Sequence, residues 1–292
     1  MTHAWQPFNW YRDVAYYDLI FDQTTQEEVA FLEGIVERHG HGAPSGRAAL
    51  HQDGAQRQLG ARPGRAGRAL PRVLEPGCGS GRLVAALAER GWSVTGFDIE
   101  PRALGFAKAR VKGTARRRIA LSLGRFDAFQ APRAHFDLAH CLYSTLLHAT
   151  APGEAERHLQ RVCSALRVGG LYVIGLHLTE YDRTEPIRER ADCRRRGLRV
   201  IYTLRHDLPD RATRLQPMRC RLSVRRAGSQ SVRRLESRWN FRTYDERELR
   251  QLLCSEPRFR LVATHDFHHD LHSLNEGRHA TFDRVLILKR TR

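Results

Sequence analysis

The sequence predicts an α/β protein in which a mostly parallel sheet is packed between helices and a smaller antiparallel sheet follows it. Three observations predict this class. Between about residues 72 and 176, apolar runs typical of strands alternate with runs typical of helices, as in parallel sheets with right-handed crossovers. A glycine-rich turn joins the first strand to its helix. From residues 199 to 242 the apolar period changes to two, which indicates antiparallel strands.

The composition is that of a soluble globular protein, because 41% of the 292 residues are hydrophobic and 28% are charged. No apolar run approaches the roughly 18 residues that a membrane span needs. The N-terminus lacks the apolar core and small-residue cleavage site of a signal peptide. We therefore expect a cytoplasmic protein that does not contact a membrane. The six cysteines form no C-x-x-C pair, so we expect reduced thiols and no thiolate metal site.

The chain is strongly basic, with a net charge of +17 from 49 basic and 32 acidic residues. Residues 41–72 and 183–260 hold this surplus, almost entirely as arginine. A basic surface can attract nucleic acid through its long-range field. Because no nucleic-acid recognition motif accompanies the charge, we favour a solvated arginine-rich surface and keep nucleic acid as the alternative partner.

The first 71 residues divide into two parts. A capping box at Thr24 or Thr25, followed by apolar residues at helical spacing, predicts helices over residues 5–40. Residues 41–71 are small and basic, with almost no large apolar side chains. Such a stretch cannot bury enough apolar surface to fold, so we expect a flexible insertion.

The parallel sheet is expected to begin at Val73. Ser80 is predicted to cap the first helix, which ends near Gly91, and Pro101 takes the favoured first position of the next helix. The later strands of this sheet are expected at residues 93–98, 119–126, 136–142 and 171–176, with a helix over 153–167.

The second part of the chain is expected to form the smaller sheet and to complete the larger one. A capping box at Thr243 and Glu246 predicts one more helix. The antiparallel strands are expected at residues 199–207, 214–226 and 231–242, and two final strands at 259–267 and 281–289.

The glycine turn has the sequence E-P-G-C-G-S-G from Glu75 to Gly81. Glycines let a ligand approach the backbone closely, and the helix that follows presents free N–H groups. The dinucleotide fingerprint is G-x-G-x-x-G, but Arg82 stands where its third glycine would fall. Asp98 ends the second strand, where a carboxylate can accept both hydroxyls of a ribose.

The turn and Asp98 together resemble the class I S-adenosylmethionine-dependent methyltransferases. Asp127 in the run RFDAF, the strand at 136–141 and the paired glycines at 169–170 extend the resemblance over residues 72–178. The resemblance implies a Rossmann-like three-layer sandwich with seven strands, the last of them antiparallel. It also implies S-adenosylmethionine as the cofactor.

The resemblance implies a division of the chain. We expect an N-terminal helical lid over 1–40, the insertion over 41–71, a core formed by 72–180 and 243–292, and an antiparallel insertion over 181–242 that covers the substrate.

It also implies the cofactor-binding residues. The glycines would make room for the amino acid end, Asp98 would hold the ribose and Asp127 would lie beside the adenine. In the alternative interpretation, Glu75 only ends a strand and Asp127 is a turn residue. The expected cofactor site comprises Tyr17, Glu75, Gly77, Gly79, Gly81, Asp98, Ile99, Asp127 and Ala128.

Candidate catalytic groups follow strands four and five, near the expected sulfonium. His140 is the first choice as base or acceptor-positioning group, with Tyr143 and His177 beside it; Cys141 and His148 fall in the same stretch. A hydrogen-bonded histidine at the end of a strand is the alternative for His140. The donor is already activated, so in-line methyl transfer requires no metal.

The run from His265 to His272 is rich in metal-ligand residue types, but strand alternation would send neighbouring side chains to opposite faces, so we expect no metal there. Because the hairpin before the last strand borders the expected site, a role for one of these histidines at the acceptor pocket stays open.

The sequence thus predicts methyl transfer to a nitrogen or oxygen of a small molecule. An RNA or DNA methyltransferase is one alternative. Against it, the fourth-strand region reads DLAHCLYS and lacks the D/N-P-P-Y/F motif of methyltransferases that act on base amino groups. A protein that binds S-adenosylmethionine without catalysis is the other. The oligomeric state and the acceptor are not predicted.

Overall fold

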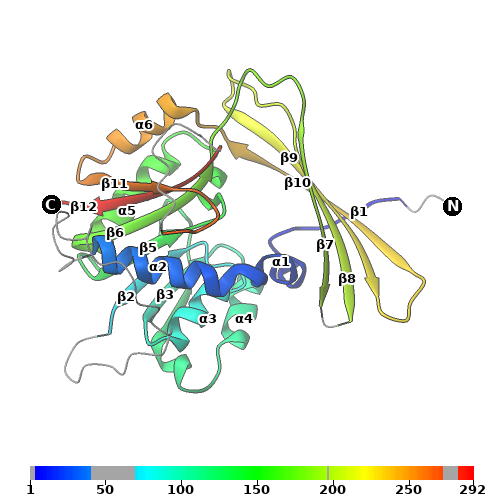
Figure 1. The fold of residues 1–292 in the computed structure, drawn as a ribbon, viewed down its shortest axis with the longest axis horizontal. Coiled ribbons are helices and arrows are strands. Elements are labelled where there is room, and N and C mark those ends of the chain that lie inside the picture. Colours follow the sequence, from blue (N-terminus) through cyan, green and yellow to red (C-terminus); the bar gives the residue numbers. More distant parts are fainter. Residues whose placement is uncertain (1–3, 41–69, 196, 272–281) are drawn as a thin grey trace, which may run out of the picture.

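The computed structural model describes residues 4–40, 70–195, 197–271 and 282–292. Figure 1 shows a helix-flanked sheet and, beside it, a second sheet that the N-terminal segment joins to the first. The flexible insertion expected at 41–71 lies, except for its last two residues, outside the described residues. In the described part of the chain, no helix combines the length and the apolar character that crossing a membrane would take.

The larger sheet has seven strands in the order β11-β12-β6-β5-β2-β3-β4. Strand β12 runs antiparallel to both of its neighbours, and the other pairings are parallel. The expected fold class is therefore confirmed. The strands are β2 (Arg72–Pro76), β3 (Ser93–Asp98), β4 (Ile119–Leu123), β5 (Phe136–Cys141), β6 (Leu166–His177), β11 (Phe259–His265) and β12 (Asp283–Arg290).

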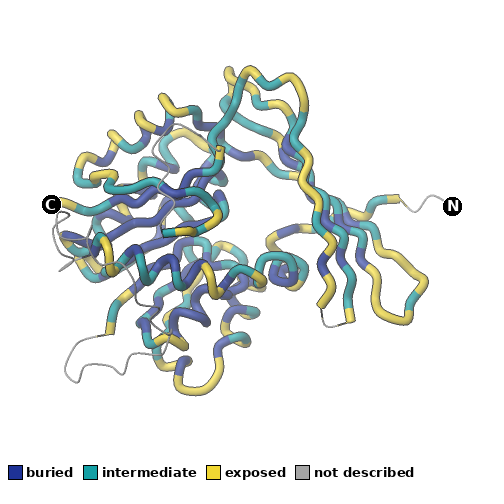
Figure 2. The backbone as a smooth tube through the Cα atoms, in the orientation of Figure 1, coloured by how far each residue is buried: buried dark blue, intermediate teal, exposed yellow. Residues whose placement is uncertain are grey.

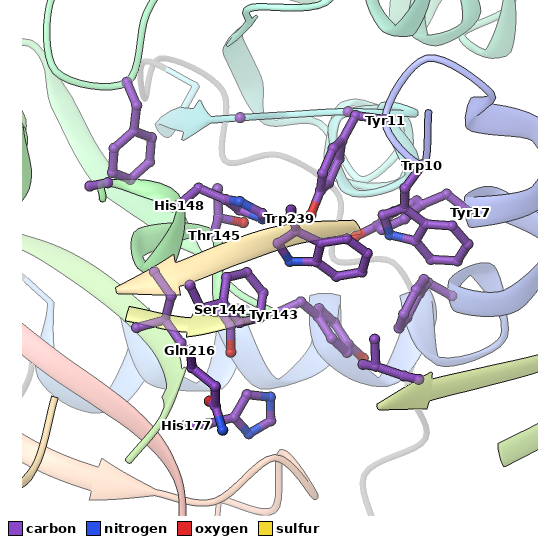
Figure 3. Close-up of a pocket in the computed structure, with 18 of the residues that line it drawn as sticks. Trp10, Tyr11, Tyr17, Tyr143, Ser144, Thr145, His148, His177, Gln216 and Trp239 are labelled. Atoms are coloured by element: carbon purple, nitrogen blue, oxygen red, sulfur yellow. Dashed lines mark hydrogen bonds between the residues drawn. The ribbon is translucent and has the colours of Figure 1, made fainter. Parts of the chain in front are cut away.

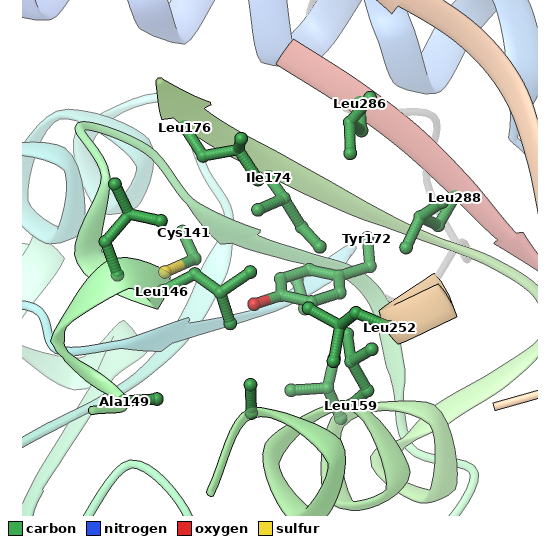
Figure 4. Packing of buried hydrophobic residues seen from close by; sticks show 14 of the residues in the cluster. Cys141, Leu146, Ala149, Leu159, Tyr172, Ile174, Leu176, Leu252, Leu286 and Leu288 are labelled. Carbon is green, nitrogen blue, oxygen red and sulfur yellow. The ribbon is translucent and has the colours of Figure 1, made fainter. Parts of the chain in front are cut away.

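Helices cover both faces of this sheet. Alternate strand residues point to opposite faces, so Val285 packs with the core under α2 and α3, while Leu286 packs with the core under α5 and α6. Figure 4 shows the second of these cores around Tyr172, and Figure 2 shows that the central strands of this sheet are largely buried. The helices are α2 (Thr25–His39), α3 (Arg82–Glu89), α4 (Pro101–Arg110), α5 (Glu154–Ala165) and α6 (Glu246–Cys254), with short 3-10 turns η2 (Gly113–Arg118) and η3 (Thr145–His148).

The second sheet has five strands in the order β1-β10-β9-β8-β7. The three expected strands are present, and two further ones were not expected. Strand β7 is rich in charged residues, and β1 is a two-residue strand from the N-terminal segment that pairs parallel to β10. The strands are β1 (Gln6–Pro7), β7 (Ile187–Arg195), β8 (Leu198–His206), β9 (Leu215–Arg226) and β10 (Val232–Arg242).

The N-terminal segment runs from the edge of the second sheet to the larger one. Trp10 is buried in the cluster on the second sheet, and α1 (Val14–Phe21) lies between the two sheets (Figure 1). The turn before α1 is held by Asn9, whose Oδ1 accepts hydrogen bonds from the backbone N–H groups of Tyr11 (2.9 Å) and Arg12 (3.0 Å). A short 3-10 turn, η1 (Asp22–Thr24), leads into α2.

The expected caps at two helices are wrong. At α3 the N-cap is Gly81, and the Ser80 hydroxyl makes no capping bond. At α2 the Thr24 hydroxyl donates to the Glu28 carboxylate at 2.7 Å instead of capping the backbone. Tertiary packing decides both cases, because Ser80 is buried and Glu28 is drawn into an ion pair.

The capping box of α6 exists, but two residues later than expected from Thr243 and Glu246. Asp245 is the N-cap: its Oδ1 accepts from the Glu248 backbone N–H at 2.8 Å, while the Glu248 side chain accepts from the Asp245 N–H at 2.9 Å. The same motif, shifted by two residues, starts the helix later than the sequence interpretation placed it.

A buried ion pair fastens α2 to α3. Glu28 is fully buried, and its two carboxylate oxygens accept from the two terminal nitrogens of Arg82, each at 2.6 Å. The Tyr143 hydroxyl, in the loop after β5, donates to the same carboxylate at 3.0 Å. Because Arg82 directly follows the glycine turn, this ion pair holds α2 against the turn.

Replacing Arg82 with methionine should leave the Glu28 carboxylate buried without its cation. We expect the free energy of unfolding to fall by about 3–5 kcal/mol in chemical denaturation. Arg90→Met is the matched control, because Arg90 pairs with Glu33 between the same two helices but both side chains are 31% exposed; its cost should stay below about 1 kcal/mol. Equal losses in the two variants would contradict the role of the buried pair.

Candidate functional site

A cavity of about 1090 Å³ lies between the carboxyl ends of the parallel strands and the second sheet. Ligands of open α/β sheets bind at this edge. The glycine turn and β3 form one end, β8 and β10 form the other, and the N-terminal segment forms a wall. Figure 3 shows Trp10, Tyr11 and Tyr17 entering the same space as His148 and His177. A volume of this size holds a cofactor and a small substrate together.

The three glycines of the turn all have positive φ, but a side chain would meet different surroundings at each. A Cβ on Gly79 would have no atom within 4 Å and would enter the cavity. A Cβ on Gly77 would lie 2.8 Å from Thr145 Cγ2, and one on Gly81 would lie 2.5 Å from the Cβ of Ala107 on α4. Gly79 therefore makes room for a ligand, whereas Gly81 lets α3 and α4 pack closely.

Asp98 lies directly beside the glycine turn, as the sequence predicts. Its Oδ2 accepts from the Gly79 backbone N–H at 2.8 Å and its Oδ1 from the Glu100 N–H at 2.9 Å. Burial raises the pKa of this carboxyl, although the backbone N–H groups act in the opposite direction. Ile99 follows with an exposed side chain on the cavity wall.

Asp127 also lines the cavity, but arginines occupy its carboxylate. Arg157 Nη2 donates to Oδ2 at 2.9 Å, and Arg125 Nε donates to Oδ1 at 3.2 Å. The hydrogen bond from Arg157 is the main reason why the pKa of Asp127 is lowered. Ala128 is not part of the wall; Phe126 is, with its ring stacked on His158 at 3.5 Å between centroids.

Glu75 and His140 meet beneath the glycine turn rather than in the large cavity. They line a separate space of about 40 Å³, with Glu75 Oε2 3.8 Å from His140 Nε2, and neither atom has a hydrogen-bond partner in the structure. Burial raises the pKa of Glu75 to about 8 and lowers that of His140 to about 3. Such a space can hold one water molecule bridging the two groups.

This position does not suit His140 as the base that was our first choice. Its strand is central in a parallel sheet, so both strand faces are covered and the ring is 1% exposed. Cys141 is buried with it. The buried strand-end histidine that the sequence analysis gave as the alternative therefore describes this position better.

Tyr143 and Tyr17 both line the large cavity. Tyr143 has a positive φ of 55°, and burial is the main reason why its pKa is raised. Its hydroxyl is bound to Glu28, so the ring forms part of the wall while the hydroxyl ties the loop to α2. Burial raises the pKa of Tyr17 to about 12, so its hydroxyl stays protonated at neutral pH.

His148, at the end of η3, points into the cavity from the loop after β5 (Figure 3). Its Nε2 lies 2.6 Å from the Tyr11 hydroxyl. Burial lowers the pKa of His148 to about 4, so the ring is neutral at pH 7. This hydrogen bond therefore joins the N-terminal segment to the loop after β5.

Two histidine–carboxylate pairs face each other at the far end of the cavity. His177 Nδ1 lies 2.5 Å from Asp283 Oδ1 at the end of β6, and His206 Nε2 lies 2.8 Å from Glu189 Oε1 on the second sheet. The two rings are 5.9 Å apart between centroids. His177 was expected in the site. His206 and Glu189 were missed, although both are polar residues at inward positions of their strands.

The cavity is acidic in a basic protein. Among the described residues, its wall holds seven carboxylates and two arginines, whereas the chain carries +17. The arginines are Arg125 and Arg183, and the carboxylates belong to Asp98, Glu100, Asp127, Glu154, Glu180, Glu189 and Asp283. The cavity therefore favours ligands that carry positive charge.

The histidine-rich run borders the cavity through Phe267, whose ring centroid lies 5.1 Å from that of His177. The fully buried His265 has its Nδ1 3.2 Å from the Asp270 carbonyl oxygen and packs against Phe31. His272 lies outside the described residues. No three metal-ligating side chains in the described ranges are grouped so that they could hold a metal ion.

Glu75 should make stability depend on pH. Its pKa is raised on folding, so the folded state retains a proton that the unfolded chain releases, and stability falls as pH rises from about 5 to about 8. Glu75→Gln removes this loss. The free energy of unfolding of the variant, minus that of the original protein, should increase steadily across this window in urea denaturation. A difference that is constant from pH 5 to 8 would contradict the raised pKa.

Comparison with known proteins gives the same picture as the geometry. Residues 73–170 match the family described as a methyltransferase domain. An uncharacterized methyltransferase of Synechocystis sp. is 31% identical over 107 residues, which are 36% of this chain and 47% of that protein. The chain therefore spans about half the length of this curated relative.

Two solved structures match over nearly the whole chain. The S-adenosylmethionine-bound amino pentose methyltransferase CalS10 of Micromonospora echinaspora has a TM-score of 0.67 at 17% identity, covering 99% of this chain and 100% of that one. The sugar N-methyltransferase KedS8 of a Streptoalloteichus species has a TM-score of 0.66 at 14% identity, covering 100% and 96%. Residues 73–170 thus match a methyltransferase domain, and the chain as a whole has the fold of these two solved methyltransferases.

Proposed function

We propose that the protein transfers the methyl group of S-adenosylmethionine to a nitrogen or oxygen of a small-molecule acceptor. The observation that carries this proposal is the single cavity that begins at Gly79 and Asp98 and ends at the two histidine–carboxylate pairs. One end suits the cofactor and the other end suits a polar acceptor. When bound, S-adenosylmethionine supplies an activated methyl group for in-line displacement.

The residues around the glycine turn would hold the cofactor. Gly79 leaves the space that its amino acid end needs, and the Glu75–His140 pair lies beneath that space. Asp98 retains lone pairs that can accept the ribose hydroxyls. Ile99 and Phe126, both on the wall, could enclose the adenine, with Asp127 held beside it by Arg157. The seven carboxylates of the wall favour the positive sulfonium.

The far end of the cavity would bind the acceptor. Asp283 accepts a hydrogen bond from His177 Nδ1–H, which leaves Nε2 as the proton acceptor facing the cavity. His177 would thereby remove the proton that an amine or hydroxyl acceptor loses. His148, kept neutral by burial and bound to Tyr11, would position the acceptor at the methyl group. Most of the rate would come from this alignment, which can supply about 7–11 kcal/mol.

The proposal is tested by S-adenosylhomocysteine formation from S-adenosylmethionine with a panel of small amines, alcohols and phenols. We expect acceptor-dependent release of S-adenosylhomocysteine. Cofactor binding without turnover on any acceptor would favour a binding protein instead. Turnover only with RNA or DNA would show that the acceptor class is wrong.

Cofactor binding should depend on the open space at Gly79. S-adenosylhomocysteine at 100 times its dissociation constant should stabilise the protein by about 2.7 kcal/mol, seen as a rise in Tm. Gly79→Ala should weaken its binding at least tenfold. Gly91→Ala is the matched control, since Gly91 also has positive φ and open surroundings but lies outside the cavity. If both variants kept the full Tm shift, the assignment of the turn would fail.

Turnover should depend on His177. His177→Gln is expected to lower kcat/KM by about 10²–10⁴-fold, the usual contribution of a general base, and to leave S-adenosylhomocysteine binding intact. Asp283→Asn should cause a smaller loss in the same direction. His135→Gln, at the opposite end of the strands, serves as the control. Unchanged kcat/KM in His177→Gln would remove this residue from the mechanism.

A further inference from the structure

The second sheet has an outer face, formed by the side chains of β7 to β10 that point away from the cavity. Strand alternation separates the two faces: Tyr202, His206 and Trp239 line the cavity, whereas their sequence neighbours point outward. Figure 2 shows the resulting alternation of buried and accessible residues along these strands. None of the outward-pointing residues of these strands lines the cavity.

One arginine from each of these four strands forms a continuous row across the outer face. Arg188 on β7 is paired with Arg205 on β8, Arg205 with Arg219 on β9, and Arg219 with Arg238 on β10. Directly paired residues of antiparallel strands lie on the same face, with neighbouring strands about 4.8 Å apart. The row therefore places four positive charges within about 14 Å.

Arginines also flank this row. Two residues along the strands, about 6.6–6.8 Å away, Arg190 and Arg221 stand on β7 and β9 in the next row. The row after that contains Asp192 and Arg234, and the row beyond it pairs Arg194 with Arg199 and Arg199 with Arg225. The positive charge therefore forms a two-dimensional array rather than a single line.

Internal carboxylates neutralise only part of the array. Glu236 pairs with Arg221 and Arg238, Asp207 pairs with Arg205, and Asp192 pairs with Arg194 and Arg199. Among the described residues, Arg188 and Arg219 have no ion pair with a carboxylate. Burial lowers the pKa of Arg219, and the charges of Arg221 and Arg205 add to this effect. Like charges placed directly opposite each other destabilise a sheet, so this row costs stability that an anionic partner would restore.

An aromatic ring accompanies the arginines. Trp5, just before β1, stacks over the guanidinium of Arg221 at 4.6 Å from the ring centroid. Planar guanidinium groups bind phosphates with paired hydrogen bonds, and aromatic rings stack on bases. Proteins usually bind single-stranded nucleic acid on positively charged surfaces that carry such aromatic rings. Proteins that recognise duplex DNA instead place a helix or a β-ribbon in its major groove.

From this arrangement we propose that the outer face of the second sheet binds single-stranded nucleic acid, with the phosphates on the arginine array and a base on Trp5. This face points away from the cavity. The bound nucleic acid would therefore be a docking partner and not the methyl acceptor. The proposal does not depend on the methyltransferase activity.

The test is binding of a fluorescein-labelled 20-nucleotide oligo(U) to the full chain, followed by anisotropy at a series of NaCl concentrations. Four phosphate contacts correspond to a slope of about −2.8 in a plot of log K against log salt concentration. Arg188→Gln/Arg219→Gln should make this slope shallower by about 1.4 and weaken binding roughly tenfold or more at 0.1 M salt. Its Tm should not fall, because the substitution removes like-charge repulsion.

The matched control is Arg102→Gln/Arg117→Gln, which removes the same charge from exposed positions on α4 and η2. It should keep the slope of the original protein. Equal losses in both double variants would mean that net charge alone drives binding and would overturn the proposal. Absence of oligo(U) binding at 50 mM salt, or binding to phosphatidylglycerol vesicles in its place, would overturn it as well.

Discussion

The ion pair between Glu28 and Arg82 connects the parts of the molecule that form the site. Arg82 starts the helix after the glycine turn, and Glu28 belongs to α2, which follows the N-terminal segment. The pair therefore joins the helix behind that segment to the turn that forms one end of the cavity. Tyr143 joins the same carboxylate from the loop after β5. Three segments far apart in the sequence thus take their relative positions from one buried charge that must remain compensated.

The position of the site between two sheets has an electrostatic result. The outer face of the second sheet carries the arginine array. The face toward the cavity contributes Glu189 and His206 to an acidic wall. A single sheet therefore separates charge of opposite sign by alternation along its strands alone. Ligands that approach this protein meet a positive exterior and a negative interior, and these select for different chemistry.

Much of the fold was predictable because its signals are local. The glycine turn, its strand and Asp98 lie close together in sequence, and the period of two over β8 to β10 reports one covered face directly. Strand β7 was missed because its run IRERADCRR carries charged residues on both faces, and β1 because two residues give no period. His140 was misplaced because its place in the sequence does not show that its ring lies beneath the glycine turn and outside the large cavity. The cap at Thr24 did not form because the Thr24 hydroxyl donates to the Glu28 carboxylate, which is held in the ion pair with Arg82.

The turn at Asn9 bears on how the cavity takes up its ligands. Two backbone N–H groups bound by the Asn9 side chain, Trp10 packed on the second sheet and Tyr11 joined to His148 give this wall a defined shape of its own. Because this wall is already ordered, it loses little conformational entropy when a ligand binds. More of the free energy of the ligand contacts therefore contributes to affinity.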